Sequence, residues 1–238
     1  MSPEQFLALL LDAPLHSWGF AGRFQRRTTG MHPTKSALTG LLAAALGLSK
    51  HEEGEGAAIE ALGALRHTVV TLPRVDPSHP SGRAIRRLED YHTVEGTRRA
   101  SGKVDEGTVQ TYRHYLLDAR FGVVLHAPVG WQLPDGRGLD ALAERVRDPV
   151  WGIWFGRKCC LPAAPVFVGG PFAQFQQAWR ALLRAAGLPE ASSLSAFTRV
   201  EEADSFGEGV DTINDQPLTF ARPNTHAPRR IRVITRSP

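Results

Sequence analysis

The chain has 238 residues, a formal net charge of +4 and a sequence pI near 9.4, which fits one large domain or two small ones. Its hydrophobic and charged fractions, 42% and 22%, are those of a globular protein with a buried core, and no apolar run is long enough to span a bilayer. The first residues lack the pattern of a signal peptide, and the two cysteines, Cys159 and Cys160, are adjacent, which disfavours a disulfide between them. We therefore expect a soluble cytoplasmic protein that has no membrane partner.

The first part of the chain predicts two strands and two helices. The apolar run at residues 6–11 has the length of a buried strand. After an irregular, glycine-containing stretch, residues 33–48 carry leucines and alanines at helical spacing, and Gly47 marks the end of this helix. Residues 57–65 favour a second, shorter helix, and residues 69–72 favour a strand.

The middle of the chain interrupts this pattern. Residues 73–113 are polar and charged with little apolar periodicity, which is typical of a long insertion that builds no core of its own. Regular spacing resumes after it. The expected strands are 121–125, 165–168, 197–200 and 231–234, with a further apolar run at 152–155, and the expected helices are 139–146 and 172–187.

The expected elements follow the order strand–helix–strand twice along the chain, which indicates an α+β protein with a ferredoxin-like arrangement. Many RNA-binding proteins, including the RRM, have this fold. The strands carry no aromatic motif of the RRM type, so the sequence does not support stacking of bases on the sheet face.

The first candidate site is a basic loop and the helix start that follows it. Residues 13–50 contain five basic residues and no acid. Free backbone N–H groups, the positive end of the helix dipole and two hydroxyls suit an anion such as phosphate. An ordinary capped helix after a basic surface loop explains the same pattern. The candidate RNA-binding residues here are Trp18, Arg23, Arg26, Arg27, Thr34, Lys35 and Ser36.

The second candidate site lies in the polar insertion and just after it. Aromatic rings alternate there with cations, which suits single-stranded nucleic acid because rings stack on bases while arginines follow the backbone. A mobile surface hairpin with solvated charges is the alternative, since several acids lie between the cations. The candidates are Tyr91, His92, Arg98, Arg99, Lys103, Gln110, Tyr112 and Arg113.

The third candidate site is the short sequence Gly156-Arg157-Lys158. A glycine lets the backbone approach a ligand closely, and two adjacent cations suit phosphate. A basic turn on the surface is the alternative interpretation.

Catalytic and metal chemistry find less support. The residues His92, His114, Tyr91 and Tyr112 would suit a metal-free ribonuclease, although such residues are more often surface or RNA-contact groups. The adjacent cysteines have no second cysteine pair and no nearby histidine, and the acids at 204, 211 and 215 follow no ligand pattern. We expect no metal and no cofactor.

Five pieces of sequence, in this order, resemble the CasD family (Cas-five), the RAMP-type subunit at the foot of the CRISPR type I Cascade complex. The likeness runs from the first strand almost to residue 238 and is closest to subtype I-E. The pieces are LLLDAPLHSWG at 9–19, PTKSALTGLL at 33–42, DYHTV at 90–94, TVQTYRHYL at 108–116 with Asp118 and Ala119, and GRKC at 156–159.

The resemblance implies one RAMP-type domain over residues 1–238. Its fold would be a modified ferredoxin-like (RRM-like) domain with an extended thumb insertion at about 73–113. A C-terminal extension with additional strands would occupy about 171–238. No further domain is implied.

The resemblance also implies partners. A protein of this family binds the 5′ handle of crRNA, caps the filament of guide-backbone subunits and helps seat the large PAM-recognising subunit, with target DNA near the complex. Antiviral DNA interference is the implied purpose. Because base pairing reads the target, the protein would hold the RNA by its backbone and shape.

One branch of the family, subtype I-C, cuts precursor RNA and uses a tyrosine near the end of the first helix. Alignment on Ser36, Ala37 and Gly40 puts Leu46 at that position, and leucine neither donates nor accepts a proton. We therefore expect a non-catalytic subunit, with a metal-independent endoribonuclease for precursor crRNA as the alternative.

Overall fold

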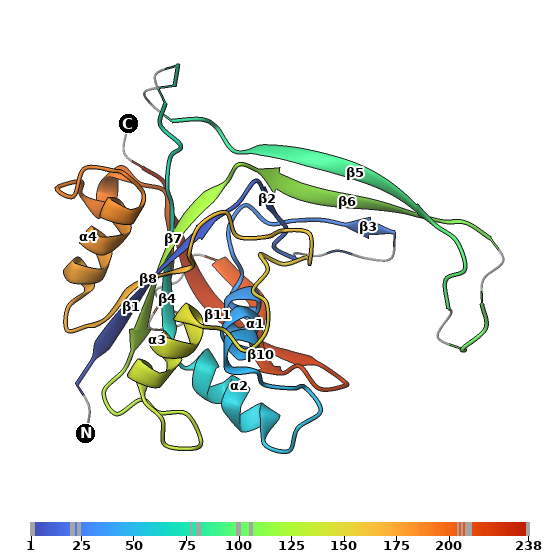
Figure 1. Cartoon of the computed structure of the whole chain (residues 1–238), viewed down its shortest axis with the longest axis horizontal. Helices are drawn as coiled ribbons and strands as arrows, with labels where there is room; N and C mark the ends of the chain where they lie inside the picture. Colours follow the sequence, from blue (N-terminus) through green and yellow to red (C-terminus); the bar gives the residue numbers. More distant parts are fainter. Residues whose placement is uncertain are drawn as a thin grey trace.

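The computed structural model describes residues 3–19, 22, 25–76, 78–79, 82–98, 101–104, 107–203, 205, 207 and 211–236. Within these ranges the chain forms a body and a long two-stranded arm that projects from it (Figure 1). The helices are α1 (Lys35–Leu46), α2 (Glu55–Gly63), α3 (Leu139–Arg147) and α4 (Phe175–Ala185), with a short 3-10 turn at Leu194–Ala196. None of the described helices combines the length and apolar composition that a membrane-spanning helix needs.

The described strands of the body form one sheet in the order β10-β11-β9-β4-β7-β1-β8, and every neighbouring pair is antiparallel. The fold is therefore a mixed α+β fold with antiparallel sheets. The strands of this sheet are β1 (Gln5–Asp12), β4 (Arg66–Thr71), β7 (Arg120–Ala127), β8 (Phe167–Phe172), β9 (Arg199–Glu202), β10 (Asp211–Thr219) and β11 (Thr225–Ile234).

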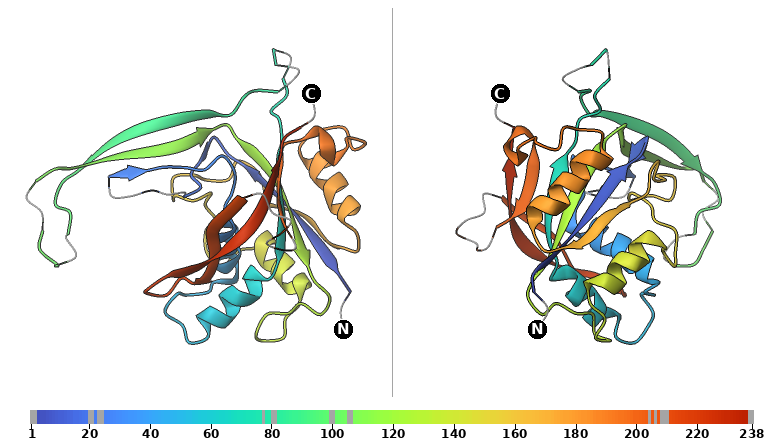
Figure 2. Two further views of the ribbon diagram at one scale, coloured as in Figure 1. Left: turned by 180° about the vertical axis from the view of Figure 1, so that it is seen from behind. Right: turned by 60° about the vertical axis from the view of Figure 1, so that its left-hand side comes forward.

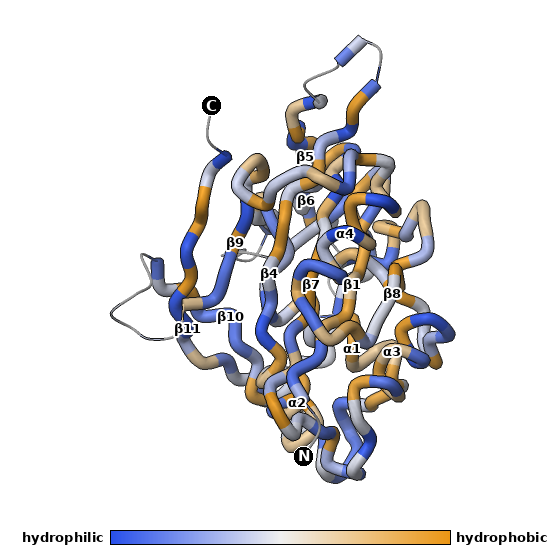
Figure 3. Tube along the Cα trace, turned by 90° about the vertical axis from the view of Figure 1, so that its left-hand side faces the viewer, coloured by the Kyte–Doolittle hydropathy of each residue, from blue (hydrophilic) through white to orange (hydrophobic). Residues whose placement is uncertain are grey.

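Two hydrophobic cores lie on opposite faces of this sheet. On β1, Leu7, Leu9 and Leu11 join the core that α1, α2 and α3 cover. The alternate residues of β1 face the other core, which α4 covers with Trp179 and neighbouring side chains. Burial on both faces explains why β1 is a continuous apolar run instead of an alternating one, and Figure 3 shows the hydrophobic residues gathered along it.

The arm belongs to a second sheet. Strands β5 (Arg86–Val94) and β6 (Val109–Leu117) pair along their whole length. Two short strands lie against β6: β2 (Leu15–His16) near its base and β3 (Arg26–Arg27) at its middle. Figure 2 shows the arm reaching well beyond the body in a second view. The arm contributes Tyr115 and Leu116 to the core at its base, whereas most side chains of β5 are exposed.

Most expected elements are present, and the differences have simple causes. The strand expected at 6–11 and the helices expected at 33–48, 57–65 and 139–146 correspond to β1, α1, α2 and α3. The helix expected from 172 begins at Phe175, because Phe172 ends β8. The apolar run at 152–155 is a loop whose Ile153 and Phe155 are buried as anchors. The polar insertion is regular in part, since it contains β5 and the start of β6.

Candidate nucleic-acid interface

A groove with a volume of about 1070 Å³ runs along α1. Four segments line it: the basic loop at 17–28, the outer side of α1, the loop at 152–157 and the β10–β11 hairpin. On α1 the lining residues include Ala37, Gly40 and Ala44, which place no bulky side chain in the groove. The groove therefore brings together segments from the beginning, the middle and the C-terminal part of the chain.

Trp18 anchors the basic loop from inside. Its side chain is 1% exposed and packs with Phe121 and Phe155. Its backbone N–H donates to Thr29 Oγ1 at 2.8 Å, and its carbonyl accepts from the N–H of Gly30 at 2.8 Å. In this conformation Trp18 shapes the loop and its ring is out of reach of RNA.

The basic loop places two arginines beside the arm and the groove. The guanidinium of Arg26 lies 4.9 Å from the ring centre of Tyr112 and 3.3 Å from a carboxylate oxygen of Glu89. Arg27, its neighbour in β3, lines the groove. The third arginine expected in this loop, Arg23, lies outside the described residues.

The loop at 152–158 is held against the basic loop by its glycine. Gly156 has φ +100°, and a Cβ at this position would lie 1.7 Å from the carbonyl oxygen of Ser17. Such a close approach of two backbones requires glycine. The N–H of Ser17 also donates to the Phe155 carbonyl at 2.9 Å, so the two loops form one wall of the groove.

Arg157 connects three of the segments. Its guanidinium donates to the carbonyls of His114 (3.1 Å) and Arg27 (3.0 Å), and it lies 4.6 Å from the ring centre of Tyr115. These carbonyl contacts orient the group without neutralising it, so a positive charge remains at the edge of the groove. Lys158 is exposed, with its ammonium 5.8 Å from the ring centre of Trp154.

Backbone N–H groups at the start of α1 already donate to side chains of this protein. Thr34 caps the helix by accepting from the N–H of Ala37 at 3.2 Å, and the N–H of Lys35 donates to Asp215 Oδ2 at 2.8 Å. The Lys35 ammonium is 2.9 Å from a Glu202 carboxylate oxygen and is buried, and this burial lowers its pKa. The expected anion cradle is therefore occupied by carboxylates of this chain, and Lys35 has a structural partner.

Thr34 and Ser36 nevertheless line the groove. The hydroxyl of Ser36 lies 3.1 Å from His226 Nε2, across the groove on β11. This contact joins the helix start to the C-terminal hairpin through two groups that also hydrogen-bond readily to RNA.

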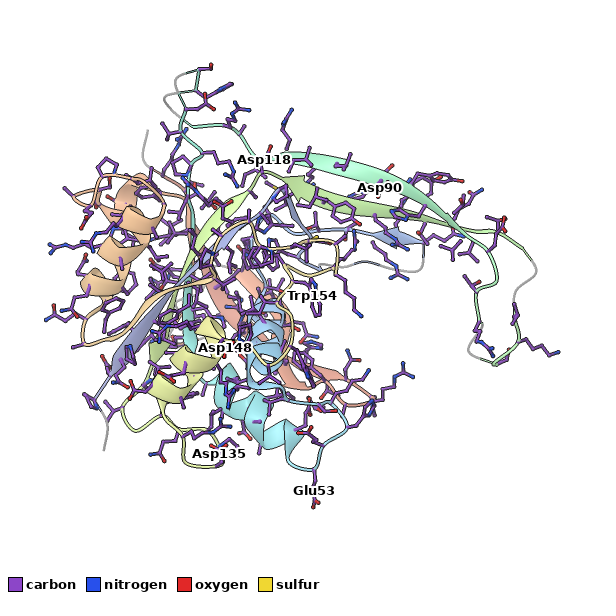
Figure 4. All side chains as sticks on the ribbon, in the orientation of Figure 1. Glu53, Asp90, Asp118, Asp135, Asp148 and Trp154 are labelled. Atoms are coloured by element: carbon purple, nitrogen blue, oxygen red, sulfur yellow. The ribbon has the colours of Figure 1, made fainter. Side chains whose placement is uncertain are left out.

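The arm carries the second candidate set. Tyr91 and Tyr112 face each other across the two strands with ring centres 5.4 Å apart, and Tyr91 is 51% exposed. His92 pairs with Asp90, which Figure 4 labels on the arm, and His114 Nε2 lies 2.6 Å from a Glu89 carboxylate oxygen. These carboxylates temper the positive charge of the arm, as the sequence predicts.

The remaining arm candidates are spread along its length. Gln110 is exposed near the outer end of β6, and Arg113 donates from Nε to Thr111 Oγ1 at 3.3 Å. Arg98 and Lys103 are exposed beyond the strand ends, and Arg99 lies outside the described residues. The arm therefore brings its candidates together only in part, and none of its described candidates lines the groove along α1.

The sequence analysis missed the groove residues of the C-terminal hairpin: Asn214, Phe220, Asn224 and His226. Phe220 lies over α1, where a Cβ on Gly40 would be 3.7 Å from its ring. One signal was available, because residues 222–238 contain five basic residues and no acid. That signal says nothing of position, since only the folded hairpin brings these side chains to α1.

No group of three or more His, Cys, Asp or Glu side chains in the described residues has a geometry that would hold a metal ion. Burial raises the pKa of the Cys160 thiol to about 11, so this cysteine is a core residue rather than a nucleophile. Burial likewise lowers the pKa of His16 to about 4, and its Nε2 lies 2.8 Å from the Ala119 carbonyl. These buried groups support the fold rather than chemistry.

The fold is similar to that of chains in solved structures of CRISPR proteins. A structure titled "CRISPR RNA-guided surveillance complex" contains a chain that superposes with a TM-score of 0.68 at 24% identity, over 96% of this chain and 89% of that one. A second structure, "Crystal structure of Cas protein", gives 0.60 at 26% identity, over 97% and 95%.

The sequence places the chain within that class. The model of the family described as CRISPR-associated protein (Cas_Cas5) matches residues 6–233, and the chain belongs to this family. It is also 34% identical over 170 residues to the CRISPR system Cascade subunit CasD of Escherichia coli (strain K12), which covers 70% of this chain and 71% of that protein.

Proposed function

We propose that this chain is a non-catalytic subunit of a CRISPR type I Cascade complex that binds the 5′ handle of crRNA in the groove along α1. One observation carries the proposal: the groove collects Ser17, Ser36, Gly156 and Arg157 from three separate segments that resemble the CasD family, and Arg27 of the basic loop lines it beside them. Oriented arginines, hydroxyls and a closely approaching backbone suit a phosphate chain held by shape. Membership of the Cas_Cas5 family supports the same assignment.

We further propose that the body is a ferredoxin-like RAMP domain. The elements β1, α1–α2, β4, β7, α3 and β8 follow one another as strand–helix–strand twice. The strand order β4-β7-β1-β8 supports this assignment. In this proposal the thumb insertion (73–113) is the arm, and the C-terminal extension (171–238) adds α4 and the strands β9, β10 and β11.

The arm and the body would serve different partners. An exposed arm that extends from the body suits contact with the guide RNA beyond the handle and with the adjacent guide-backbone subunit. Seating of the large PAM-recognising subunit, close to target DNA, would then fall to the surface around the handle. We assign no single residue to these protein contacts.

The residue at the end of α1 supports a role in binding RNA without cutting it. Leu46 is the last residue of the helix and packs against the core, where the cutting branch of the family has a tyrosine. A side chain without a titratable group in this place supports binding without cleavage. Because the arm carries histidines, the alternative function, a metal-independent endoribonuclease, is tested against this proposal.

Binding and cleavage of a labelled repeat-derived RNA by the full-length protein test the proposal. We expect a stable complex and no cut product in EDTA. Arg27→Ala and Arg157→Ala should each weaken binding and reduce the slope of log affinity against log salt by about 0.7, the value for one phosphate contact on a single strand. Arg145→Ala, on the exposed side of α3, is the matched control and should change neither.

Two results would count against the proposal. Site-specific cleavage in EDTA would favour the endoribonuclease, and Tyr91→Phe or His92→Ala should then abolish cutting. An unchanged salt slope in both groove variants would mean that these arginines are ordinary surface residues.

A further inference from the structure

Trp154 is the aromatic side chain that the loop at 152–157 contributes to the groove. The side chain is neither buried nor fully exposed, and Figure 4 labels it on this loop beside α1. Its ring lies over the backbone of Gly152, where a Cβ would come within 2.9 Å of the indole. The absence of a side chain at Gly152 therefore leaves the space that the indole ring occupies.

The other tryptophans of the chain have different environments. Trp18, Trp131 and Trp179 are at most 7% exposed and belong to the cores. Trp131 and Trp179 each donate their indole N–H to a carbonyl, at 2.7 Å and 3.0 Å. Trp151 is 45% exposed but does not line the groove. Trp154 thus differs from all of them, because it combines partial exposure with a place in the groove.

The side chains around Trp154 suit a bound nucleobase. The ammonium of Lys158 lies 5.8 Å from its ring centre, and Arg157 lies on the same loop. The aromatic ring pairs among the described residues do not include Trp154. Phe220 and Asn224 also line the groove. A flat apolar ring beside cations is the chemistry that proteins use for single-stranded nucleic acid.

We propose that Trp154 is a stacking platform for one nucleobase of the RNA held in the groove, with Lys158 and Arg157 beside the adjoining phosphates. The proposal rests on the proposed function, because it presupposes that the groove takes RNA. It adds a specific contact: the groove holds one base by its face as well as the chain by its phosphates. Stacking is indifferent to base identity, so this contact fixes register rather than sequence.

The test compares three variants of the full-length protein on the repeat-derived RNA. Trp154→Ala should weaken binding about 10- to 100-fold, which is the usual range for a lost base–aromatic stack. The salt slope should stay unchanged, because no charge is removed. Trp154→Phe should retain most of the affinity. Trp151→Ala, three residues away and outside the groove, is the matched control and should bind as the unchanged protein does.

An RNA series locates the base. The same RNA is prepared with one abasic nucleotide at each position in turn. One position should reproduce the loss caused by Trp154→Ala, and at that position the variant should lose nothing further. In the unchanged protein, the fluorescence of 2-aminopurine placed at this position should be quenched on binding. This measurement does not depend on the folding of any variant.

The outcomes separate the two proposals. If Arg157→Ala weakens binding while Trp154→Ala and every abasic RNA bind normally, the groove holds RNA and the stacking proposal is wrong. If Trp154→Ala weakens binding equally for all abasic RNAs and no 2-aminopurine is quenched, Trp154 has only a structural role and the proposal is likewise wrong. If neither arginine variant changes the affinity or its salt slope, the proposed function itself fails.

Discussion

Gly156 lines the groove with a backbone conformation that only glycine adopts without strain. Its φ of +100° disfavours any L side chain, and the carbonyl of Ser17 occupies the space where a Cβ would lie. The sequence analysis predicted a close backbone approach at this glycine, but it assigned the approach to a ligand. In the structure the approaching partner is the basic loop of the same chain, and the ligand would meet the wall that the two loops make together.

Substitution of this glycine should therefore affect both folding and binding. We expect Gly156→Ala to lower the free energy of unfolding by about 3 kcal/mol, from backbone strain and the forced displacement of Ser17, and to weaken RNA binding. Gly136→Ala is the control, because Gly136 has φ +82° but nothing within 4 Å of its Cβ position. Its cost should be about 1 kcal/mol, with RNA binding unchanged. Urea unfolding and RNA titration measure these quantities, and equal costs for both variants would contradict the account.

Two residues show where sequence reasoning about single side chains stops. Trp18 and Lys35 stand in segments that resemble the CasD family, and both residue types are common in RNA sites. Both are buried here, one as the anchor of a loop and the other in an ion pair with Glu202. A tryptophan or a lysine can lie in the core, lie on the surface or contact a ligand. Only the packing around the side chain determines which of these applies.

The β10–β11 hairpin is the element that completes the groove, and buried charges hold it to α1. Asp215 on β10 accepts from the backbone of Lys35 and from Arg229 Nε at 2.8 Å and 2.6 Å. Glu202 on β9 accepts from the Lys35 ammonium at 2.9 Å. At the turn, the N–H of Phe220 donates to Glu55 Oε1 on α2 at 2.7 Å. The hairpin is thus fastened to α1 at the middle of β10 and to α2 at its turn.

Removal of one charge from this network should cost far more than removal of a surface charge. We expect Lys35→Met to lower the free energy of unfolding by about 3–5 kcal/mol, because it leaves Glu202 buried without its ammonium partner. Arg184→Met is the matched control. Its pair with Glu190 has a comparable distance of 2.8 Å but lies on the surface, so the change should leave the free energy of unfolding nearly unchanged. Chemical denaturation of both variants checks this, and a cost for Lys35→Met no larger than the control would contradict the account.

The elements differ in how far their sequences predict them. The strand β1 and the helix α1 carry strong apolar patterns, because both are covered by core residues. The strand β10 was not predicted, since its buried side chains, Asp215 and Pro217, are not the apolar residues by which a strand is recognised. Strand β5 was taken only as part of a polar insertion, because it is exposed along its length and needs no apolar face. Pairing with a partner strand, rather than local preference, makes both of them regular.

At the scale of the whole molecule, the groove exists only because segments separated by most of the chain meet on α1. Their order along the sequence was sufficient to indicate the family, but the sequence did not show that residues 27, 36, 156 and 226 share one surface. The arm, in contrast, extends away from this surface (Figure 1). We therefore propose two functional regions: a groove that would hold the 5′ handle and an arm that would reach other parts of the complex.

Photo-crosslinking of the assembled complex tests this claim most directly. The guide RNA would carry 4-thiouridine at single positions of its 5′ handle, and the crosslinked peptides of this chain would be identified by mass spectrometry. We expect handle crosslinks within residues 26–36, 152–158 and 214–226, the segments that line the groove. Handle crosslinks confined to α3, α4 or the arm, with none in these three segments, would contradict the account.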